Sequence, residues 1–295
     1  MILIFLLQNL ITGIMLGMVY GTLALGFVVL HKSTGILNFA QGALVAIGAY
    51  ICWALIEQVG LYSWLSIILT LILCFVLGLI LERFPIRLIA KRVGGHAFAM
   101  ILATFMLLVF FTSLIVLIWG GVWQTYPRFF PSKPITFFTL VISQEQCWSA
   151  VICAALLGIF VLLFRYTKLG LLMRGTANDL HIARSLGVRV NTIIAISWGI
   201  SSVICGLGGI LLGAITVVNL SLSEIGLAAL PAAIVGGMNS IPGAIVGGLI
   251  MGTTICIFDA YIGSGFGIIG SYVIMIAVLL IRPWGILGSE KTERV

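Results

Sequence analysis

Two amide side chains stand at the start of an apolar run, where they could hydrogen-bond a polar solute. Asn38 and Gln41 lie in GILNFAQGALVAIGAY, residues 35–50. A spacing of three places both on one helical face, and Gly42 permits close packing or local unwinding. Unwound backbone at membrane depth is tolerated only where it is buried in protein or lines a watery cavity. The segment therefore predicts either a solute-contacting face or a helix–helix contact held by amide hydrogen bonds.

A second interruption falls within residues 228–248, AALPAAIVGGMNSIPGAIVGG. Pro231 and Pro242 limit helix continuity there, and the glycine pairs permit tight backbone approach. Short apolar arms around a Gly/Pro tip are typical of the broken helices of transporters, whose helix ends face the solute path. The alternative is a structural turn between two spans. The candidate pathway residues at this tip are Gly236, Gly237, Asn239 and Ser240.

A third segment, residues 165–190, reads RYTKLGLLMRGTANDLHIARSLGVRV. Thr176, Asn178 and Asp179 are residue types that begin helices, and Gly187 is a type that ends them. A helix of about two turns is predicted between them, with apolar residues at i, i+3 and i+6. Such a helix suits docking into a groove on a cytoplasmic partner, or else lying on anionic lipid. The expected docking residues are Asp179, Leu180, Ala183, Arg184, Leu186 and Gly187.

The remaining reactive residue types form no catalytic pattern. None of the three histidines, His31, His96 and His181, pairs with a cysteine or carboxylate at metal-ligand spacing. The six cysteines show no C-x-x-C spacing, and no G-x-x-x-x-G-K-[ST] segment occurs. We therefore expect no metal, no cofactor and no ATP site in this chain, and an enzyme is disfavoured.

The elements that position these segments are predicted to be membrane-spanning helices. Of 295 residues, 62% are hydrophobic and only 8% are charged, against about 25% charged in soluble domains. The fold class is thus an all-α, polytopic transmembrane helical bundle of about eight spans. Whether residues 225–259 cross twice or form a re-entrant hairpin leaves the number between seven and nine. The other spans are predicted near residues 5–30, 36–56, 61–81, 98–118, 147–164, 191–216 and 264–281.

The net charge of +7 is explained by the positive-inside rule. If the basic segments after the first, third, fifth and last spans are cytoplasmic, 13 of the 15 basic residues lie inside. The N-terminus is then outside, as part of a retained first span, and the C-terminus is cytoplasmic. The cytoplasmic loops therefore account for the basic balance; membrane lipid is expected as a partner, and nucleic acid is not needed. The acidic residues assigned to the outer loops are Glu57, Glu145, Glu224 and Asp259.

Taken together and in this order, these segments resemble the branched-chain amino acid permease family of ATP-binding-cassette importers, most closely its H-type inner-membrane subunit. The resemblance covers most of the chain. The segments that carry it are LNFAQGALVAIGAY (37–50), RGTANDLHIARSLGV (174–188), AAIVGGMNSIPGAIVGGLIMG (232–252) and RPWGILG (282–288).

The resemblance implies a single permease domain, residues 1–295, in a bacterial inner membrane, with 165–190 as a cytoplasmic coupling loop. It implies three kinds of partner, namely a homologous second permease, two ATP-binding subunits that carry the ATP, and an extracytoplasmic substrate-binding protein. The family often has His-Gly-Glu where this chain has Gln41-Gly42-Ala43. The resemblance implies branched-chain or other hydrophobic amino acids as the leading substrate. Because the carboxylate of that family pattern is missing here, urea, short amides or another small polar solute are the alternative. An autonomous channel or secondary transporter is the alternative of a different class.

Overall fold

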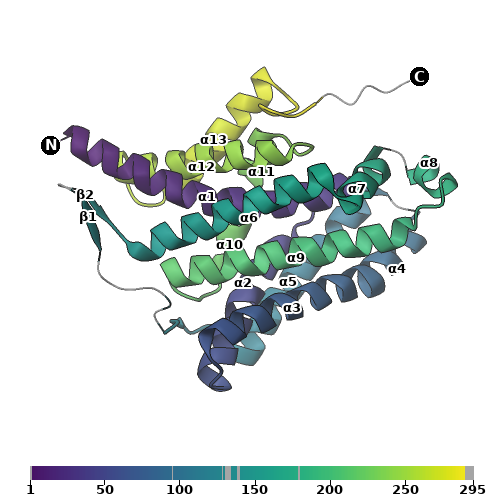
Figure 1. Ribbon diagram of the computed structural model, residues 1–295, viewed down its shortest axis with the longest axis horizontal. Coiled ribbons are helices and arrows are strands. Elements are labelled where there is room, and N and C mark those ends of the chain that lie inside the picture. The colour runs from purple at the N-terminus through teal and green to yellow at the C-terminus, as the bar shows by residue number, and fades with distance from the viewer. Residues whose placement is uncertain are drawn as a thin grey trace. The chain divides into compact units, whose positions relative to one another are not determined.

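The chain folds into helices joined by short connections, apart from one small β-hairpin (Figure 1). The computed structural model describes residues 2–94, 96–127, 129, 134–137, 140–178 and 180–289. The hairpin pairs β1 (Ile135–Phe137) with β2 (Leu140–Ile142) in antiparallel register, Ile135 opposite Ile142. The helical, polytopic fold class expected from the sequence is confirmed.

Seven helical segments in the described ranges are long and apolar enough to cross a membrane. Two of them contain a stretch of wider π-helix. They are α1 (Ile2–Thr34); α2 (Ala40–Trp53) with η1 (Ala54–Gln58); α3 (Ser63–Leu81) with η2 (Glu82–Ile86) and α4 (Arg87–Arg92); α5 (Ala97–Trp119); α6 (Gln144–Tyr166); α9 (Val190–Ile215); and α12 (Ile241–Tyr261).

The last third of the chain differs from the predicted spans. Residues 225–259 were expected to form two short arms, but the second arm is α12, a full span of 21 residues. It is preceded by two seven-residue helices, α10 (Ser221–Leu227) and α11 (Leu230–Gly236). The span expected at 264–281 is a shorter helix, α13 (Phe266–Ile281), of 16 residues. It begins only after Gly265, because the Asp259 carboxylate accepts the N–H groups of Gly265 and Gly267 (2.9 and 2.8 Å).

The chain divides into two compact units. The first unit comprises residues 1–28, 130–158 and 228–295, and the second comprises 29–129 and 159–227. The first unit thus contains most of α1 together with α11, α12 and α13, and the second contains α2–α5 and α7–α10. The single permease domain over 1–295 stays a prediction.

In the second unit, α2 is the most buried helix; α3, α5, α9 and α10 each pack against it, and α3 also packs against α9 (Figure 1). Gly48 on α2 packs directly on Gly206 of α9. The Tyr50 ring stacks on Trp119 at the end of α5, with ring centroids 5.5 Å apart. Close approach through small residues is how helices gain van der Waals contact in lipid, where apolar burial gives little driving force.

In the first unit, a glycine stripe on α1 meets one on α12. Gly13 and Gly17 pack on the backbone of α12 at Gly248, Leu249, Gly252 and Thr253, and Gly21 lies against Ala244 and Gly248. The repeat of four residues keeps each stripe on one face of its helix. A methyl group added at Gly248 would overlap the backbone of Gly21, so the two helices can approach this closely only without side chains.

We therefore expect Gly248→Ala to destabilise the protein by about 1–3 kcal/mol, the usual cost of overpacking. Gly158→Ala is the matched control, because Gly158 also lies inside a helix but has no neighbour within 4 Å of an added Cβ. That change should be neutral or slightly stabilising, since alanine favours helix more than glycine does. Thermal unfolding of the two purified variants in detergent measures the difference. Equal melting temperatures would contradict the packing argument.

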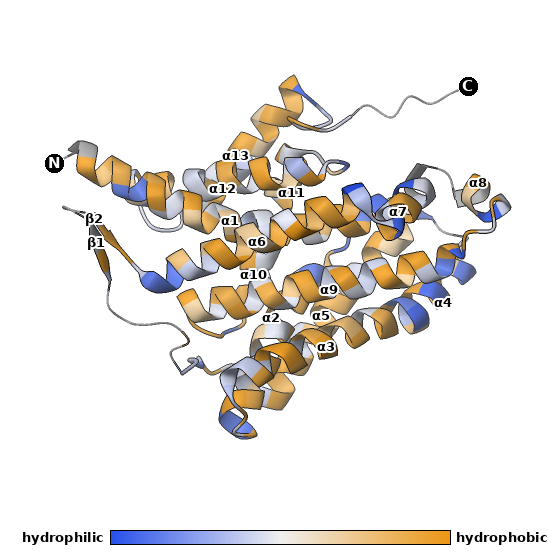
Figure 2. Cartoon of the chain, viewed as in Figure 1, coloured by the Kyte–Doolittle hydropathy of each residue, from blue (hydrophilic) through white to orange (hydrophobic). Residues whose placement is uncertain are grey.

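Hydrophilic residues of the second unit gather where α4, α7 and α8 lie (Figure 2). Here α7 spans Lys168–Asn178 and α8 spans Leu180–Ser185. The start of α9 contacts η2, α7 and α8, so these elements share one end of the unit. Basic residues supply much of this polarity. They are Arg87, Lys91, Arg92, Lys168, Arg174 and Arg184.

Candidate functional site

The amides at the start of α2 are buried inside the second unit. Asn38 Oδ1 accepts the N–H of Ala40 (3.0 Å), and Gln41 Nε2 donates to Ser201 Oγ on α9 (2.6 Å). Asn38 is 3% exposed and Gln41 is 1% exposed. Gln41 therefore makes the helix–helix contact that was one of the two alternatives, whereas Asn38 precedes α2 and bonds only the backbone two residues on, so the two amides do not share a helical face. Solute contact by Asn38 and Gln41 stays a prediction.

Part of the hydrogen-bonding capacity in this unit is not used within the described residues. Asn38 Nδ2, Gln41 Oε1, Ser202 Oγ and Ser223 Oγ are buried without a hydrogen-bond partner there. Such groups cost roughly 1–3 kcal/mol each when they stay unsatisfied. Polar atoms of this kind are the ones that water or a polar solute can satisfy.

The third residue of the first motif, Gly42, positions α10. A Cβ added at Gly42 would lie 2.6 Å from the Ser223 carbonyl oxygen and 2.8 Å from Leu227 Cγ. Gly226 on α10 returns the contact, since its added Cβ would lie 3.1 Å from Gly42 Cα. The Gln-Gly pair therefore positions two neighbours of α2: the Gln41 amide bonds α9, and Gly42 permits the close approach of α10.

The candidate residues of the second motif lie in the first unit. Gly237 has a φ of +108°, which favours glycine, and it ends α11. Ser240 Oγ accepts the N–H of Gly243 (3.1 Å) and so caps α12. Gly236 is buried against Gly243, and Asn239 is half-buried. The two predicted sets of pathway residues thus belong to different units, and their solute contact is untested.

The helix break is closed by a segment from the end of the chain. The N–H groups of Ile286 and Leu287 donate to the carbonyls of Val235 (2.8 Å) and Gly236 (3.1 Å). Gly285 and Gly288 pack against Gly237. The segments GGMNSIPG and RPWGILG, read separately in the sequence, therefore form one structure. Carbonyls at the end of α11 that could have faced a solute are paired with protein instead.

The coupling loop, residues 165–190, is built differently from the prediction. Thr176 and Asn178 do not begin a helix, because α7 runs through both of them. The second helix, α8, has six residues and ends at Gly187, with φ of +80°. Its end is closed by the N–H groups of Gly187 and Val188, which donate to the carbonyls of Arg184 (2.9 Å) and Ala183 (3.1 Å), a Schellman arrangement.

The apolar face of this loop also differs from the prediction. Ala183 was expected on the docking face, but it is only 4% exposed. Leu186 is 78% exposed, as the prediction requires, and Ile182 is 60% exposed. Asp179 and the side chain of Leu180 lie outside the described residues. The exposed apolar pair of the loop is therefore Ile182 on α8 and Leu186 in the turn that follows α8.

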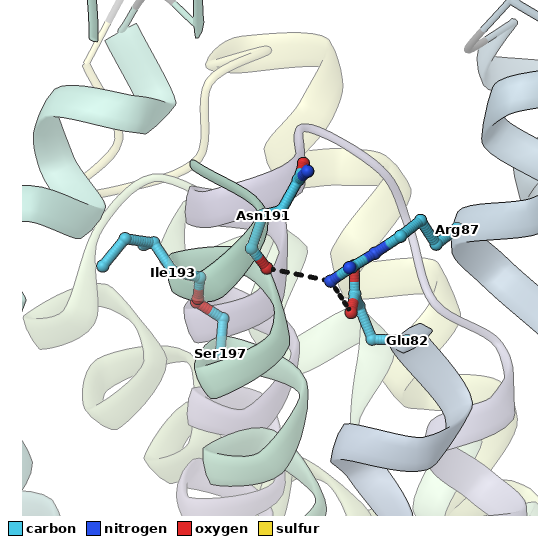
Figure 3. A network of polar contacts seen from close by, with 5 residues as sticks. All are labelled: Glu82, Arg87, Asn191, Ile193 and Ser197. Carbon is cyan, nitrogen blue, oxygen red and sulfur yellow. Dashed lines mark hydrogen bonds and ion pairs between the residues drawn. The ribbon is translucent and has the colours of Figure 1, made fainter. Parts of the chain in front are cut away.

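An ion pair between the buried Glu82 on η2 and the half-buried Arg87 on α4 links the third span to the start of α9 (Figure 3). Glu82 is 3% exposed and accepts two bonds from Arg87, from Nε (3.0 Å) and Nη2 (2.6 Å). Arg87 Nη2 also donates to the Asn191 carbonyl (3.2 Å), in the first turn of α9 after the coupling loop. Sequence reasoning missed this network, because side chains five apart meet only through the wider π-helix η2.

A cavity of about 380 Å³ lies between α5 and α10, within the second unit. Glu224, assigned from the sequence to an outer loop, is instead on α10 and lines this cavity with an exposed side chain. We call it the α5–α10 pocket. Its lining residues are Leu108, Val109, Thr112, Ser113, Val116, Leu220, Ser223, Glu224 and Leu227.

Metal-binding side chains do not cluster in the part of the chain that the structure describes. There, no three histidine, cysteine, aspartate or glutamate residues gather as an ion would require. That the chain needs no cofactor, and that ATP is bound by other subunits, stays a prediction.

Comparison with known proteins gives matches along nearly the whole chain. The family model described as "Branched-chain amino acid transport system / permease component" matches residues 9–282. The high-affinity branched-chain amino acid transport system permease protein LivH of Salmonella typhimurium is 29% identical, over 99% of this chain and 98% of its own length. The corresponding protein BraD of Pseudomonas aeruginosa is 28% identical over 98% of each. The probable branched-chain amino acid transport permease protein LivH of Methanocaldococcus jannaschii is 28% identical over 91% of this chain and 88% of its own.

Proposed function

Because the chain belongs to the branched-chain amino acid transport system permease family, we propose that it is the membrane subunit of an ATP-binding-cassette importer for branched-chain and other hydrophobic amino acids. The observation that carries this proposal is the family match over residues 9–282, which includes all seven candidate spans but for the first residues of α1. The subunit supplies an alternating-access path and leaves ATP hydrolysis to separate subunits.

The partners in this proposal are a homologous second permease, two cytoplasmic ATP-binding subunits and an extracytoplasmic substrate-binding protein. The coupling loop supports the contact with the ATP-binding subunits. Ile182 on α8 and Leu186 in the turn after it expose apolar surface outside the spans, and Arg184 lies between them in the sequence. An exposed apolar patch rimmed by polar residues is typical of a protein-binding surface.

The proposed location is a bacterial inner membrane, with the N-terminus outside and the C-terminus in the cytoplasm. The end of the second unit that carries α4, α7 and α8 is rich in basic residues, which supports a cytoplasmic position for that end. Its coupling loop would then face the compartment in which ATP is available.

Reconstitution tests the proposal. Proteoliposomes with this chain, the second permease, the ATP-binding subunits and the binding protein should accumulate labelled leucine only when ATP is supplied. Omitting the ATP-binding subunits should abolish uptake, and this chain alone should hydrolyse no ATP. Leucine flux through this chain alone, without ATP, would support the autonomous channel instead. Uptake of urea in place of leucine would support the alternative substrate class, which the replacement at Gln41-Gly42-Ala43 motivates.

A further inference from the structure

The depth of the α5–α10 pocket follows from its position along α5. Its lining residues on that helix run from Leu108 to Val116, and α5 ends at Trp119. At a rise of 1.5 Å per residue, the pocket lies about 5 to 16 Å from the end of the helix. In the proposed orientation that is the outer half of the membrane. Glu224, across the pocket on α10, therefore lies at a depth normally occupied by hydrocarbon.

A carboxylate at this depth restricts what the pocket can face. A charged side chain inside a membrane faces the protein interior or a water-filled cavity, because facing lipid tails is costly. The Glu224 side chain is exposed in this chain. The single salt bridge among the described residues joins Glu82 and Arg87, so no described cation neutralises Glu224. The pocket therefore opens on a hydrated space rather than on lipid.

The polar groups of the pocket can all accept hydrogen bonds. Glu224 contributes a carboxylate, Ser113 contributes a hydroxyl, and the buried residue Ser223 contributes a hydroxyl that has no partner in the described chain. The Thr112 hydroxyl already donates to the carbonyls of Leu108 (2.9 Å) and Val109 (3.0 Å), so it can only accept further bonds. No lysine, arginine or histidine is among the lining residues. An ammonium group, with three donors and no acceptor, complements this set.

The rest of the lining is aliphatic. Leucine and valine side chains supply it, and the volume of about 380 Å³ is at the small end of the range for ligand pockets, ~300–1,000 Å³. We propose that the α5–α10 pocket is a solute subsite, in which Glu224 and Ser223 bind the α-ammonium group of an amino acid and the aliphatic wall receives its side chain. The solute carboxylate points to the open side. The inference rests on the proposed function and adds a subsite to it.

Uptake by the complete importer provides the first test. Glu224→Gln removes the charge but keeps the shape, so we expect leucine uptake to fall at least ~10-fold with subunit assembly and basal ATP hydrolysis unchanged. Glu57→Gln is the matched control, since Glu57 is also an exposed glutamate assigned to the outer side, and it should transport normally. Normal uptake by Glu224→Gln would overturn the subsite. Failure of the wild-type importer to carry leucine would overturn the proposed function instead.

A cysteine-labelling experiment tests the accessibility and the charge of the pocket independently of transport. Ser113 is exposed and lines the pocket, whereas Phe110 is exposed at similar depth on α5 but outside it. In the assembled importer, Ser113→Cys should react with a cationic thiosulfonate at least ~10-fold faster than with an anionic one. Glu224→Gln should remove this preference, and 3-methylbutylamine should slow the reaction. Phe110→Cys should stay at the background of the wild-type chain, because it faces lipid.

Two results of that experiment would overturn the proposal. Equal reaction with both reagents would show that Glu224 does not set the charge of the pocket. Labelling of Ser113→Cys in the isolated subunit but not in the assembled importer would show that the second permease covers the pocket.

Discussion

Leu186→Glu should abolish co-purification of the ATP-binding subunits and reduce ATP-dependent leucine uptake at least ~10-fold. Leu186 is 78% exposed in the turn directly after α8, so its side chain is available to fill a partner's groove, and a charge there leaves an unpaired carboxylate in an apolar contact. A central interface residue typically contributes about 2 kcal/mol or more. Affinity purification of a tagged permease, followed by quantification of the bound ATP-binding subunits, measures the effect.

The control for this variant is Leu88→Glu. Leu88 is exposed on α4, near the same basic end of the second unit but outside the coupling loop, and its replacement should leave assembly intact. Leu186 is a cleaner target than Ala183, because a charge at the buried Ala183 would also destabilise the loop itself. If Leu186→Glu purifies with a full complement of ATP-binding subunits, α8 is not the coupling helix.

Arg87→Ala should destabilise the second unit strongly, by about 3–5 kcal/mol. It removes both bonds to Glu82, leaves that carboxylate buried without its cation, and frees the Asn191 carbonyl. Arg87→Lys keeps the charge but loses the bidentate geometry, so the free energy of unfolding should fall by an intermediate amount. The measurement is thermal unfolding in detergent, together with the yield of monodisperse protein.

The double variant Glu82→Gln/Arg87→Met tests whether the unpaired carboxylate causes the instability of Arg87→Ala. With no buried carboxylate left to compensate, it should recover most of the stability that Arg87→Ala loses. A double variant as unstable as Arg87→Ala would show that the guanidinium acts through Asn191 or through packing, and not through the ion pair. The comparison is valid because all partners in the network lie within one compact unit.

Hydropathy located the first six spans within a few residues, because a continuous apolar run of sufficient length has few alternatives in a membrane. It was wrong near the C-terminus, where α13 starts late because Asp259 caps it and α12 is longer than the Gly/Pro content suggested. It also could not place Glu224, since a short helix such as α10 looks like a loop when only long apolar runs are counted.

The candidate site was predictable as a set of residue types but not as a set of contacts. The expectation that Asn38 and Gln41 share a helical face was wrong, because Asn38 precedes α2, and the partner of Gln41 is Ser201, 160 residues away. No local pattern indicates such a partner. The same holds for the face of α8, where Ala183 follows the expected spacing and is nevertheless buried by the fold of the loop. Pairings across helices depend on tertiary packing, which a single sequence does not specify.

The hydrogen bonds from Ile286 and Leu287 to the end of α11 have a consequence for the order of biosynthesis. The first unit is assembled from both ends of the chain and a middle segment, whereas the second unit is complete by Leu227. Domains generally fold as units while the ribosome still elongates the chain. The second unit can therefore pack during translation. The carbonyls of Val235 and Gly236, in contrast, stay unpaired until Ile286 and Leu287 have been synthesised. A nascent chain that stops at Ile281 would contain every helix that the structure describes, but it would lack Ile286 and Leu287, whose N–H groups bond the end of α11.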